Sequence, residues 1–381
     1  MKVCDVVLNS VWYDPRVRKQ INEYLAHGID VVTIGSKSKR YDKEKVSLIP
    51  CKTVITEIDE RYVGHQKGIL NKFKREKLSF EVVRDAIIAE KPDVIHANDL
   101  NALIPAFAAK RKLGCRIIYD SHEVCVENFT AKKSKLAILY KMAERYMVKR
   151  VDLMICVSHA AAEYFAKEYK IKKPMVITNC APKKEIPVIR QHEKNEGFEV
   201  LNHGWFYRGR GYDIMAKSCG LFDDYDDIRI AIRGFGAMEQ ELRDTVAQLD
   251  RKNRFVFYPS VTVQELVPEA AKSYVGVAIT EPICLNFKLS VSNKIFEYVA
   301  AGLPVIMSDI PEHRYLNDKY NFGIVLRENT PEAFAEAVIK LYTDREFYNV
   351  CAENAKRLAE EVNWENEFGK LIDFLKNIQG E

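Results

Sequence analysis

The sequence has little of what marks a secreted, zinc-binding or membrane-spanning protein. Its nine cysteines are odd in number, form no Cys-x-x-Cys pair and lie mostly in apolar runs. This pattern is typical of reduced thiols that pack as small hydrophobic side chains, and it argues against a disulfide framework and a metal cluster. No run of about 18 apolar residues occurs, so no transmembrane helix is predicted. Asp5, Asn9 and Ser10 interrupt the apolar start, which indicates a first strand and no signal peptide.

Acidic residues are scarce in the first half of the chain. Residues 1–180 carry 33 Lys and Arg against 22 Asp and Glu, a net charge of +11, whereas the remainder has a net charge of −7. A basic half favours an anionic partner, such as a membrane surface, a phosphate-bearing substrate or nucleic acid. The alternative is that the uneven distribution of charge between the two halves has no binding function. The basic segments lack the interleaved aromatic residues that stack on bases, so we expect no nucleic-acid partner.

The 381 residues suggest about two domains, and the 47% hydrophobic content is typical of a globular protein. Short apolar runs alternate with helical patterns, which predicts βαβ units, parallel sheets and an α/β fold. A charged, aperiodic segment at 183–197 indicates a linker between two such series. We expect strands at 3–8, 30–35, 93–96, 116–120, 153–157 and 175–178, then at 198–202, 228–232, 255–258, 275–279 and 305–307. Residues 36–50 are polar and are expected to form a loop.

Candidate ligand-binding residues of the first half lie where strands are expected to end. Parallel sheets bind ligands at the carboxyl ends of their strands. Asp14 is expected to cap a helix that begins at Pro15, which places Arg16 near an anionic ligand. His96 and His122 fall at or just beyond the ends of two strands that we expect to be neighbours, although a lone histidine is more often structural.

Two basic segments, 64–77 and 132–150, could contact a membrane surface. The first could equally be a surface loop. In the second, a helical pattern places Leu136, Leu139 and Met147 on one face and the basic residues on the other, with only Glu144 opposing them.

A helix is expected over 292–302, because Ser292 can begin it and Gly302 can end it. Lys294 and Glu297 are the charged residues in its first turns, where unpaired N–H groups and the helix dipole favour an anion. This end could hold a phosphate, with Lys294 neutralising it and Glu297 accepting sugar hydroxyls. The alternative is a core helix with two solvated charges.

Glycine and arginine gather after two strands of the second half. The loop His203-Gly-Trp-Phe-Tyr-Arg-Gly-Arg-Gly-Tyr212 matches neither a Walker loop nor Gly-x-Gly-x-x-Gly. Glycine lets the backbone approach a ligand, and arginine pairs with phosphate oxygens. The turn at 233–236 repeats the Gly-x-Gly pattern, and Thr280 ends a third strand. Each loop alone could be a tight turn, but together they favour a diphosphate-containing ligand.

These segments together resemble the family-4 glycosyltransferases of the GT-B fold over nearly the whole chain. The most specific stretches are 293–305 and 207–211, with support from 14–17 and 119–123. The resemblance implies two Rossmann-like, doubly wound domains that face a central cleft. It assigns residues 1–182 to an acceptor domain, 183–362 to a nucleotide-sugar domain and 363–381 to a helix that crosses back to the first domain.

The family implies retaining transfer of a sugar from a nucleoside diphosphate, without a metal ion or other cofactor. The expected catalytic residues are His122, Arg210 and Lys294. The expected donor-binding residues are Gly204, Arg208, Arg210, Gly234, Asn293, Lys294 and Glu297, with Glu297 on the ribose. The expected acceptor-side residues are Asp14, Arg16, His96 and Asp99.

Two departures from the family pattern stand out. Leu289 replaces the first acid of the Glu-x7-Glu motif, and Trp205 replaces the usual arginine after the first glycine of the phosphate loop. We therefore expect a divergent glycosyltransferase that uses a nucleotide sugar, with a UDP-sugar favoured, and a glycan or lipid-linked acceptor. We expect it in the cytoplasm, at the inner membrane face if the basic segments bind lipid. Alternatives are a GT-B sugar-nucleotide epimerase, a phosphorylase, or a non-catalytic nucleotide-sugar-binding subunit.

Overall fold

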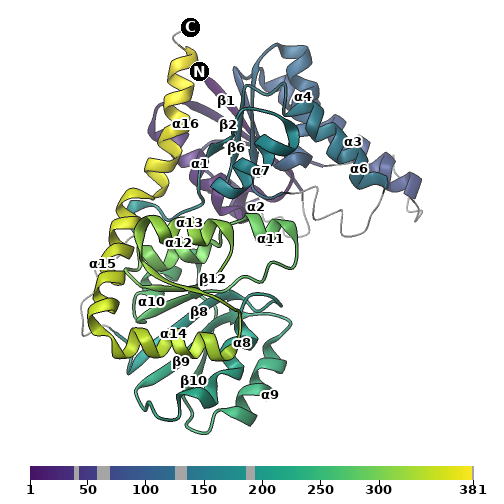
Figure 1. The fold of residues 1–381 in the computed structure, drawn as a ribbon. Helices are drawn as coiled ribbons and strands as arrows, with labels where there is room; N and C mark the ends of the chain where they lie inside the picture. The colour runs from purple at the N-terminus through teal and green to yellow at the C-terminus, as the bar shows by residue number, and fades with distance from the viewer. Residues whose placement is uncertain (38–42, 58–68, 125–134, 186–193, 380–381) are drawn as a thin grey trace. The chain divides into compact units, whose positions relative to one another are not determined.

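A computed structural model describes residues 1–37, 43–57, 69–124, 135–185 and 194–379 of the chain (Figure 1). The chain forms two compact units, Met1–Ile177 with Glu367–Glu381, and Thr178–Asn366. Each unit has its own parallel β-sheet with helices on both faces. The α/β fold predicted from the alternation of strands and helices is confirmed, as are the two Rossmann-like domains that the family resemblance implies.

The first unit holds a seven-stranded parallel sheet in the order β3-β2-β1-β4-β5-β6-β7. Its strands are β1 (Lys2–Val7), β2 (Asp30–Ser36), β3 (Lys52–Thr56), β4 (Val94–Asn98), β5 (Arg116–Ser121), β6 (Leu153–Cys156) and β7 (Met175–Val176). Its helices are α1 (Pro15–Ala26), α2 (Lys43–Ser47), α3 (Ile69–Glu90), α4 (Asp99–Leu113), α6 (Lys135–Met147), α7 (His159–Tyr169) and most of α16 (Trp364–Gln379). The order reverses between β1 and β4, and open α/β sheets bind ligands at the carboxyl ends of the strands that flank such a point.

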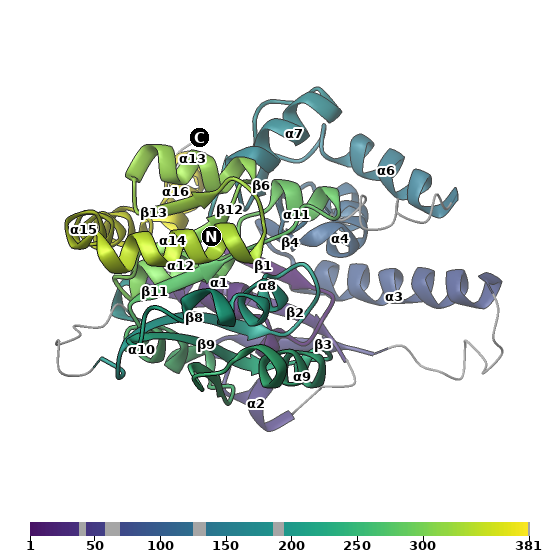
Figure 2. The ribbon, with the colours of Figure 1, turned by 60° about the horizontal axis from the view of Figure 1, so that its bottom comes forward.

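The second unit holds a six-stranded parallel sheet in the order β10-β9-β8-β11-β12-β13. Its strands are β8 (Phe198–Trp205), β9 (Ile228–Phe235), β10 (Phe255–Tyr258), β11 (Val275–Ala278), β12 (Val305–Ser308) and β13 (Gly323–Leu326). Its helices are α8 (Tyr212–Lys217), α9 (Glu239–Leu249), α10 (Leu266–Ala270), α11 (Leu285–Leu289), α12 (Asn293–Ala300), α13 (Pro311–Tyr320), α14 (Pro331–Thr343) and α15 (Arg345–Glu361) (Figure 2). Here the order reverses between β8 and β11.

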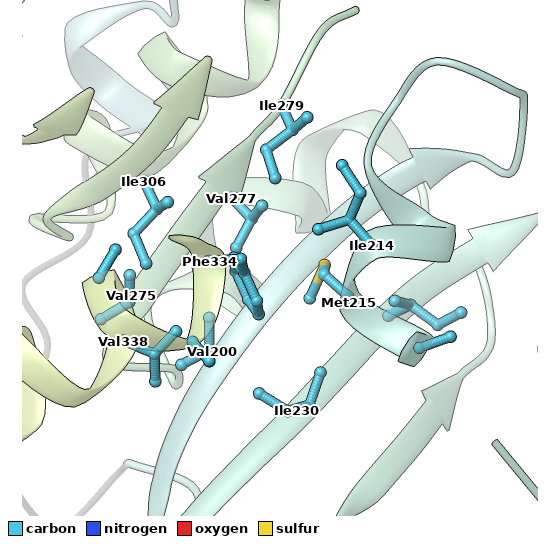
Figure 3. Packing of buried hydrophobic residues seen from close by; sticks show 14 of the residues in the cluster. Val200, Ile214, Met215, Ile230, Val275, Val277, Ile279, Ile306, Phe334 and Val338 are labelled. Carbon is cyan, nitrogen blue, oxygen red and sulfur yellow. The ribbon is translucent and has the colours of Figure 1, made fainter. Parts of the chain in front are cut away.

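In the strands of the second sheet, alternate side chains point to opposite faces, and each face packs into its own hydrophobic core. Val200 and Ile230 pack on one face against α8 and α14, including Phe334 of α14 (Figure 3). Leu201 and Ala231, each one residue further along, pack on the other face with α10 and α12. Because both faces are covered, the strands are continuous apolar runs, and polar side chains at their carboxyl ends stand out as exceptions.

Several sequence expectations were wrong or incomplete. The expected loop at 36–50 contains α2, and helix α11 before Ser292 was not predicted. Strands β3 and β13 and helix α13 were missed. Strands β8 and β9 continue to Trp205 and Phe235, so Gly204 and Gly234 belong to strand ends and not to loops. The expected Asp14 cap of α1 is confirmed, because its carboxylate accepts the backbone N–H groups of Arg16 and Val17.

The expected faces of α6 were also wrong. Glu144 is buried, although the sequence placed it among solvated lysines, and its carboxylate accepts the hydroxyls of Tyr119 at 2.6 Å and Tyr169 at 2.5 Å. Leu139, assigned to an apolar face with Met147, is 58% exposed. Two buried tyrosine hydroxyls need an acceptor, and this requirement turns Glu144 toward the sheet.

Replacing Glu144 with alanine should therefore destabilise the first unit. Two buried hydroxyls would lose their acceptor, and we expect the free energy of unfolding to fall by about 2–4 kcal/mol in urea melts. The matched control is Glu163→Ala on α7, which removes an exposed ion pair with Lys173 and should cost less than about 0.5 kcal/mol. Equal effects of the two substitutions would show that the buried hydrogen bonds do not matter.

Candidate functional site

Asn202 of β8 forms hydrogen bonds with both of the basic residues predicted to bind a diphosphate. Lys294, in the first turn of α12, donates from Nζ to Oδ1 of Asn202 at 2.7 Å. The same amide donates from Nδ2 to the backbone carbonyl of Arg210 at 3.0 Å. One buried asparagine thus fixes both a lysine on a helix and the loop that carries an arginine.

Burial gives Lys294 an unusual ionisation. Desolvation, together with the charge of Arg210, lowers the pKa of Lys294 to about 7, although Glu297 opposes the shift. The ammonium lies over the ring of Tyr212, at 5.3 Å from its centroid. Because burial disfavours the charge, an anion beside this amine would raise the pKa again.

Arg210 lies at the same end of the sheet. Its guanidinium stacks 4.2 Å from the ring centroid of Phe287, and Nη1 lies 3.5 Å from Oγ1 of Thr280 at the end of β11. Phe287 belongs to α11, the helix that the sequence did not predict. Strands β8 and β11 flank the point where strand order reverses, so both cations lie where open α/β sheets bind ligands.

Glycines bring the backbone close around these residues. Gly204 and Gly234 are paired in register, and a Cβ on Gly234 would lie 1.9 Å from the carbonyl oxygen of Gly204. Gly211, with φ of +78°, has no room for a Cβ because Ile279 packs against it. These glycines are therefore required by the packing of the strand ends.

Two predicted donor-binding residues do not join this cluster. Arg208 is 73% exposed at its side chain and pairs with Glu241 on α9 at 2.9 Å. Asn293 is exposed at the start of α12. Leu289, at the position where the resemblance expects an acid, is buried on α11.

Glu297 already has a protein partner that sequence analysis missed. Its Oε2 lies 2.6 Å from Nε2 of His203, a buried residue of β8. Trp205, two residues after His203, is exposed and forms a tilted aromatic pair with Phe235, with 5.7 Å between ring centroids. The second unit therefore presents two cations, a carboxylate and an aromatic pair at one edge of its sheet.

A buried charge cluster occupies the corresponding edge of the first unit. Asp120, at the end of β5, accepts two hydrogen bonds from Arg16, at 2.9 and 3.0 Å, and one from Gln20 at 2.8 Å. Arg16 also donates to the carbonyl of Ile177. Arg16 is buried in these contacts, and Asp120 neutralises its charge inside the protein. Its expected place near an anionic ligand stays a prediction.

His122 lies just beyond β5 and faces acceptors on both sides of its ring. Nε2 is 3.1 Å from Oδ1 of Asn98, and Nδ1 is 3.6 Å from Oδ2 of Asp99. The amide of Asn98 is oriented by its donation to Asp5 at 2.5 Å, so its oxygen faces the histidine. Burial opposes a charge on the ring, but Asp99 and Asp120 outweigh it and raise the pKa of His122 to about 9. These two carboxylates therefore favour the protonated form of the ring.

His96 does not lie at a strand end as expected. It is fully buried within β4, and its Nδ1 lies 2.6 Å from the hydroxyl of Tyr24. The strand continues two residues further than predicted, to Asn98, which explains the difference. His96 is thus part of the buried core of the first unit, whereas His122 lies just beyond the end of the neighbouring strand.

The chain matches two models of glycosyltransferase families. Residues 15–182 match Glycosyltransferase Family 4, and residues 197–344 match Glycosyl transferases group 1. An uncharacterized glycosyltransferase of Methanocaldococcus jannaschii is 21% identical over 272 residues, and the alignment covers 64% of this chain and 64% of that relative, slightly less than two thirds of its length.

Solved structures share the fold across the whole chain. Sucrose-phosphate synthase of Thermosynechococcus elongatus superposes with a TM-score of 0.78 at 15% identity, over 100% of this chain and 99% of the other. HepE of Anabaena, solved in complex with UDP, gives 0.74 at 13% identity, over 99% and 100%. Both likenesses concern the fold.

Binding of inorganic pyrophosphate should be coupled to protonation of Lys294. At pH 8 the amine is mostly neutral, and a bound anion should raise its pKa and draw in a proton. We expect calorimetry in buffers of different ionisation enthalpy to show up to about one more proton taken up by the wild type than by Lys294→Arg, since arginine is always charged. Equal proton uptake by the two proteins would place the bound anion away from Lys294.

Proposed function

The chain belongs to the family-4 glycosyltransferases of the GT-B fold, and on this basis we propose that it transfers a hexosyl group from a nucleoside-diphosphate sugar, with retention at the anomeric carbon. A UDP-sugar is the favoured donor, and the acceptor is a hydroxyl of a glycan or of a lipid-linked glycan. The observation that carries the proposal is the cluster of Lys294, Asn202 and Arg210 where strand order reverses in the second unit.

The donor diphosphate is the group that this cluster suits. Cleavage of the sugar–phosphate bond leaves negative charge on the diphosphate, and Lys294, Arg210 and the first N–H groups of α12 would stabilise that charge. Protein cations thereby take the role that a metal ion has in other transferases, and no other cofactor is needed. Glu297 would accept the ribose hydroxyls, as the family resemblance implies.

Residues of the first unit would act on the sugar and the acceptor. We assign His122 to the transferred sugar, and we assign Asp14 and Asp99 to the acceptor side. His96 and Arg16 support these residues from the core, because both are buried and hydrogen-bonded there.

Peripheral contact with an anionic membrane at the cytoplasmic face is part of the same proposal. The stretches 64–68 and 132–134 lie outside the described residues, so the proposed membrane contact rests on the side chains of α6. Ile138, Leu139, Met142 and Tyr146 are each more than half exposed, and Arg145 lies among them. Their spacing along the helix gives one apolar stripe bordered by positive charge, the pattern of helices that lie in a lipid interface. No helix among the described residues is long and apolar enough to cross a membrane.

Transfer itself is tested with candidate donors and an Arg210→Ala variant. Uridine, guanosine and adenosine diphosphates are first screened by thermal shift, since a ligand of the folded state raises the melting temperature. Sugars linked to the best nucleotide are then assayed for transfer and hydrolysis. We expect Arg210→Ala to lower turnover at least about tenfold, a loss of about 1.4 kcal/mol of transition-state stabilisation. The control is Arg208→Ala, which removes only an exposed arginine of the same loop and should change turnover less than about twofold. Unchanged turnover in folded Arg210→Ala would exclude Arg210 from catalysis.

Membrane contact is tested by sedimentation with vesicles that contain anionic phospholipid. Replacing Ile138 and Met142 with serine should weaken binding at least about tenfold, because apolar area enters the interface, and added salt should weaken it further. The matched control replaces Leu249 and Val350, which are exposed apolar residues of the second unit, and should bind like the wild type. Binding that ignores both the α6 substitutions and salt would contradict the proposal.

A further inference from the structure

His203 contacts a carboxylate within hydrogen-bonding distance near the end of β8, and nothing in the sequence pattern assigned it a role. It is the sixth residue of β8, and its side chain is only 2% exposed. Nε2 lies 2.6 Å from Oε2 of Glu297, whose own side chain is 25% exposed. A buried imidazole thus holds a carboxylate that reaches the surface.

The imidazole is held firmly by the residue next to Glu297 on α12. The backbone N–H of His203 donates to the hydroxyl of Tyr298 at 2.9 Å, and the two rings pack at 4.5 Å between centroids. Tyr298 is itself fully buried. Backbone and ring of His203 are therefore both fixed against the helix that carries Glu297.

The hydrogen-bonding pattern also defines which nitrogen carries the proton. Nε2 faces a carboxylate oxygen, which can only accept, so Nε2 is the donor. Nδ1 is buried and has no hydrogen-bond partner in the structure. A proton on Nδ1 would be an unsatisfied buried donor, whereas a bare lone pair costs less. Nε2–H therefore donates to the Glu297 carboxylate.

We propose that His203 is a positioning residue that holds the Glu297 carboxylate in the orientation that receives the ribose hydroxyls of a bound nucleotide. This inference rests on the proposed function, since it takes a nucleoside diphosphate as the ligand of the second unit. Asn202, the preceding residue of β8, holds Lys294 in the same way. Adjacent residues of one strand thus orient the two charged groups of α12, one for the phosphates and one for the ribose.

A carboxylate with one fixed orientation makes recognition of ribose selective. Removing the 2′ and 3′ hydroxyls from the ligand would leave Glu297 without its ligand partners, and burial of an unpaired polar group carries a penalty. If His203 positions the carboxylate, its loss should weaken binding of the ribonucleotide much more than binding of a dideoxynucleotide. A purely structural role would weaken both equally.

The experiment measures the ratio of dissociation constants for UDP and 2′,3′-dideoxy-UDP by calorimetry; if guanosine or adenosine diphosphate binds better, the matching pair is used. We expect the wild type to favour the ribonucleotide at least about tenfold and His203→Ala to lose most of that preference while keeping its affinity for the dideoxynucleotide within about twofold. His203→Gln, whose amide N–H can replace Nε2–H, should recover part of the preference. Glu297→Ala should abolish the preference, and the double variant should lose no more than Glu297→Ala alone.

Tyr320→Phe is the matched control, because it removes a buried tyrosine hydroxyl of the same unit that donates to Glu361 on α15 at 2.8 Å and leaves His203 and Glu297 intact. It should lower the melting temperature and keep the ribose preference. A folded His203→Ala protein with the wild-type ratio would overturn the positioning role. If His203→Ala cannot be produced, the wild-type ratio in His203→Leu, which also lacks the Nε2–H donor, would overturn it as well. A wild type that binds nucleoside diphosphates without any ribose preference would also overturn it. Failure of the wild type to bind any of them would instead refute the proposed function.

Discussion

The most consequential interaction in this protein is the hydrogen bond that Asn202 accepts from Lys294. A lysine ammonium loses much of its hydration in this position, and its pKa falls to about 7. Such a charge is costly unless something pairs with it. Asn202 supplies a neutral acceptor at 2.7 Å, and its other end is committed to the backbone at Arg210. The amine is thus held by a neutral acceptor, and the charge of Glu297 offsets only part of its desolvation.

The first unit carries buried negative charge at its strand ends. These carboxylates pair with basic side chains of the protein itself. Arg16 neutralises Asp120, while Asp99 and Asp120 both favour the protonated form of His122. The desolvation cost of these charges is offset by direct hydrogen bonds, so the cluster is rigid. The two parallel sheets are built alike, but the charged side chains at the carboxyl ends of their strands differ.

Much of this architecture could be predicted from the sequence, and the errors have physical causes. Buried parallel strands are continuous apolar runs, so most of them were found within two residues. Helix α13 was missed because its ten residues are mainly charged or polar, with few apolar positions to mark a period. The basic residues Lys294 and Arg210 were identified from motifs, and the structure brings them together through Asn202. No local pattern could pair His203 with Glu297, which are 94 residues apart in sequence and meet only because β8 lies beside α12. The pairing of Arg16 with Asp120 could not be predicted, because the two residues are 104 positions apart in the sequence.

One departure from the family pattern gives the protein a built-in spectroscopic reporter. Of its three tryptophans, Trp364 is buried and Trp12 is partly covered, with the guanidinium of Arg18 at 4.9 Å from its ring centroid. Trp205 is 59% exposed, next to Gly204 at the end of β8. Its indole is therefore a solvent-exposed emitter at this strand end, whereas the indole of Trp364 lies in the core. An arginine in that position would not fluoresce, so the substitution places a fluorescent side chain at this edge of the sheet.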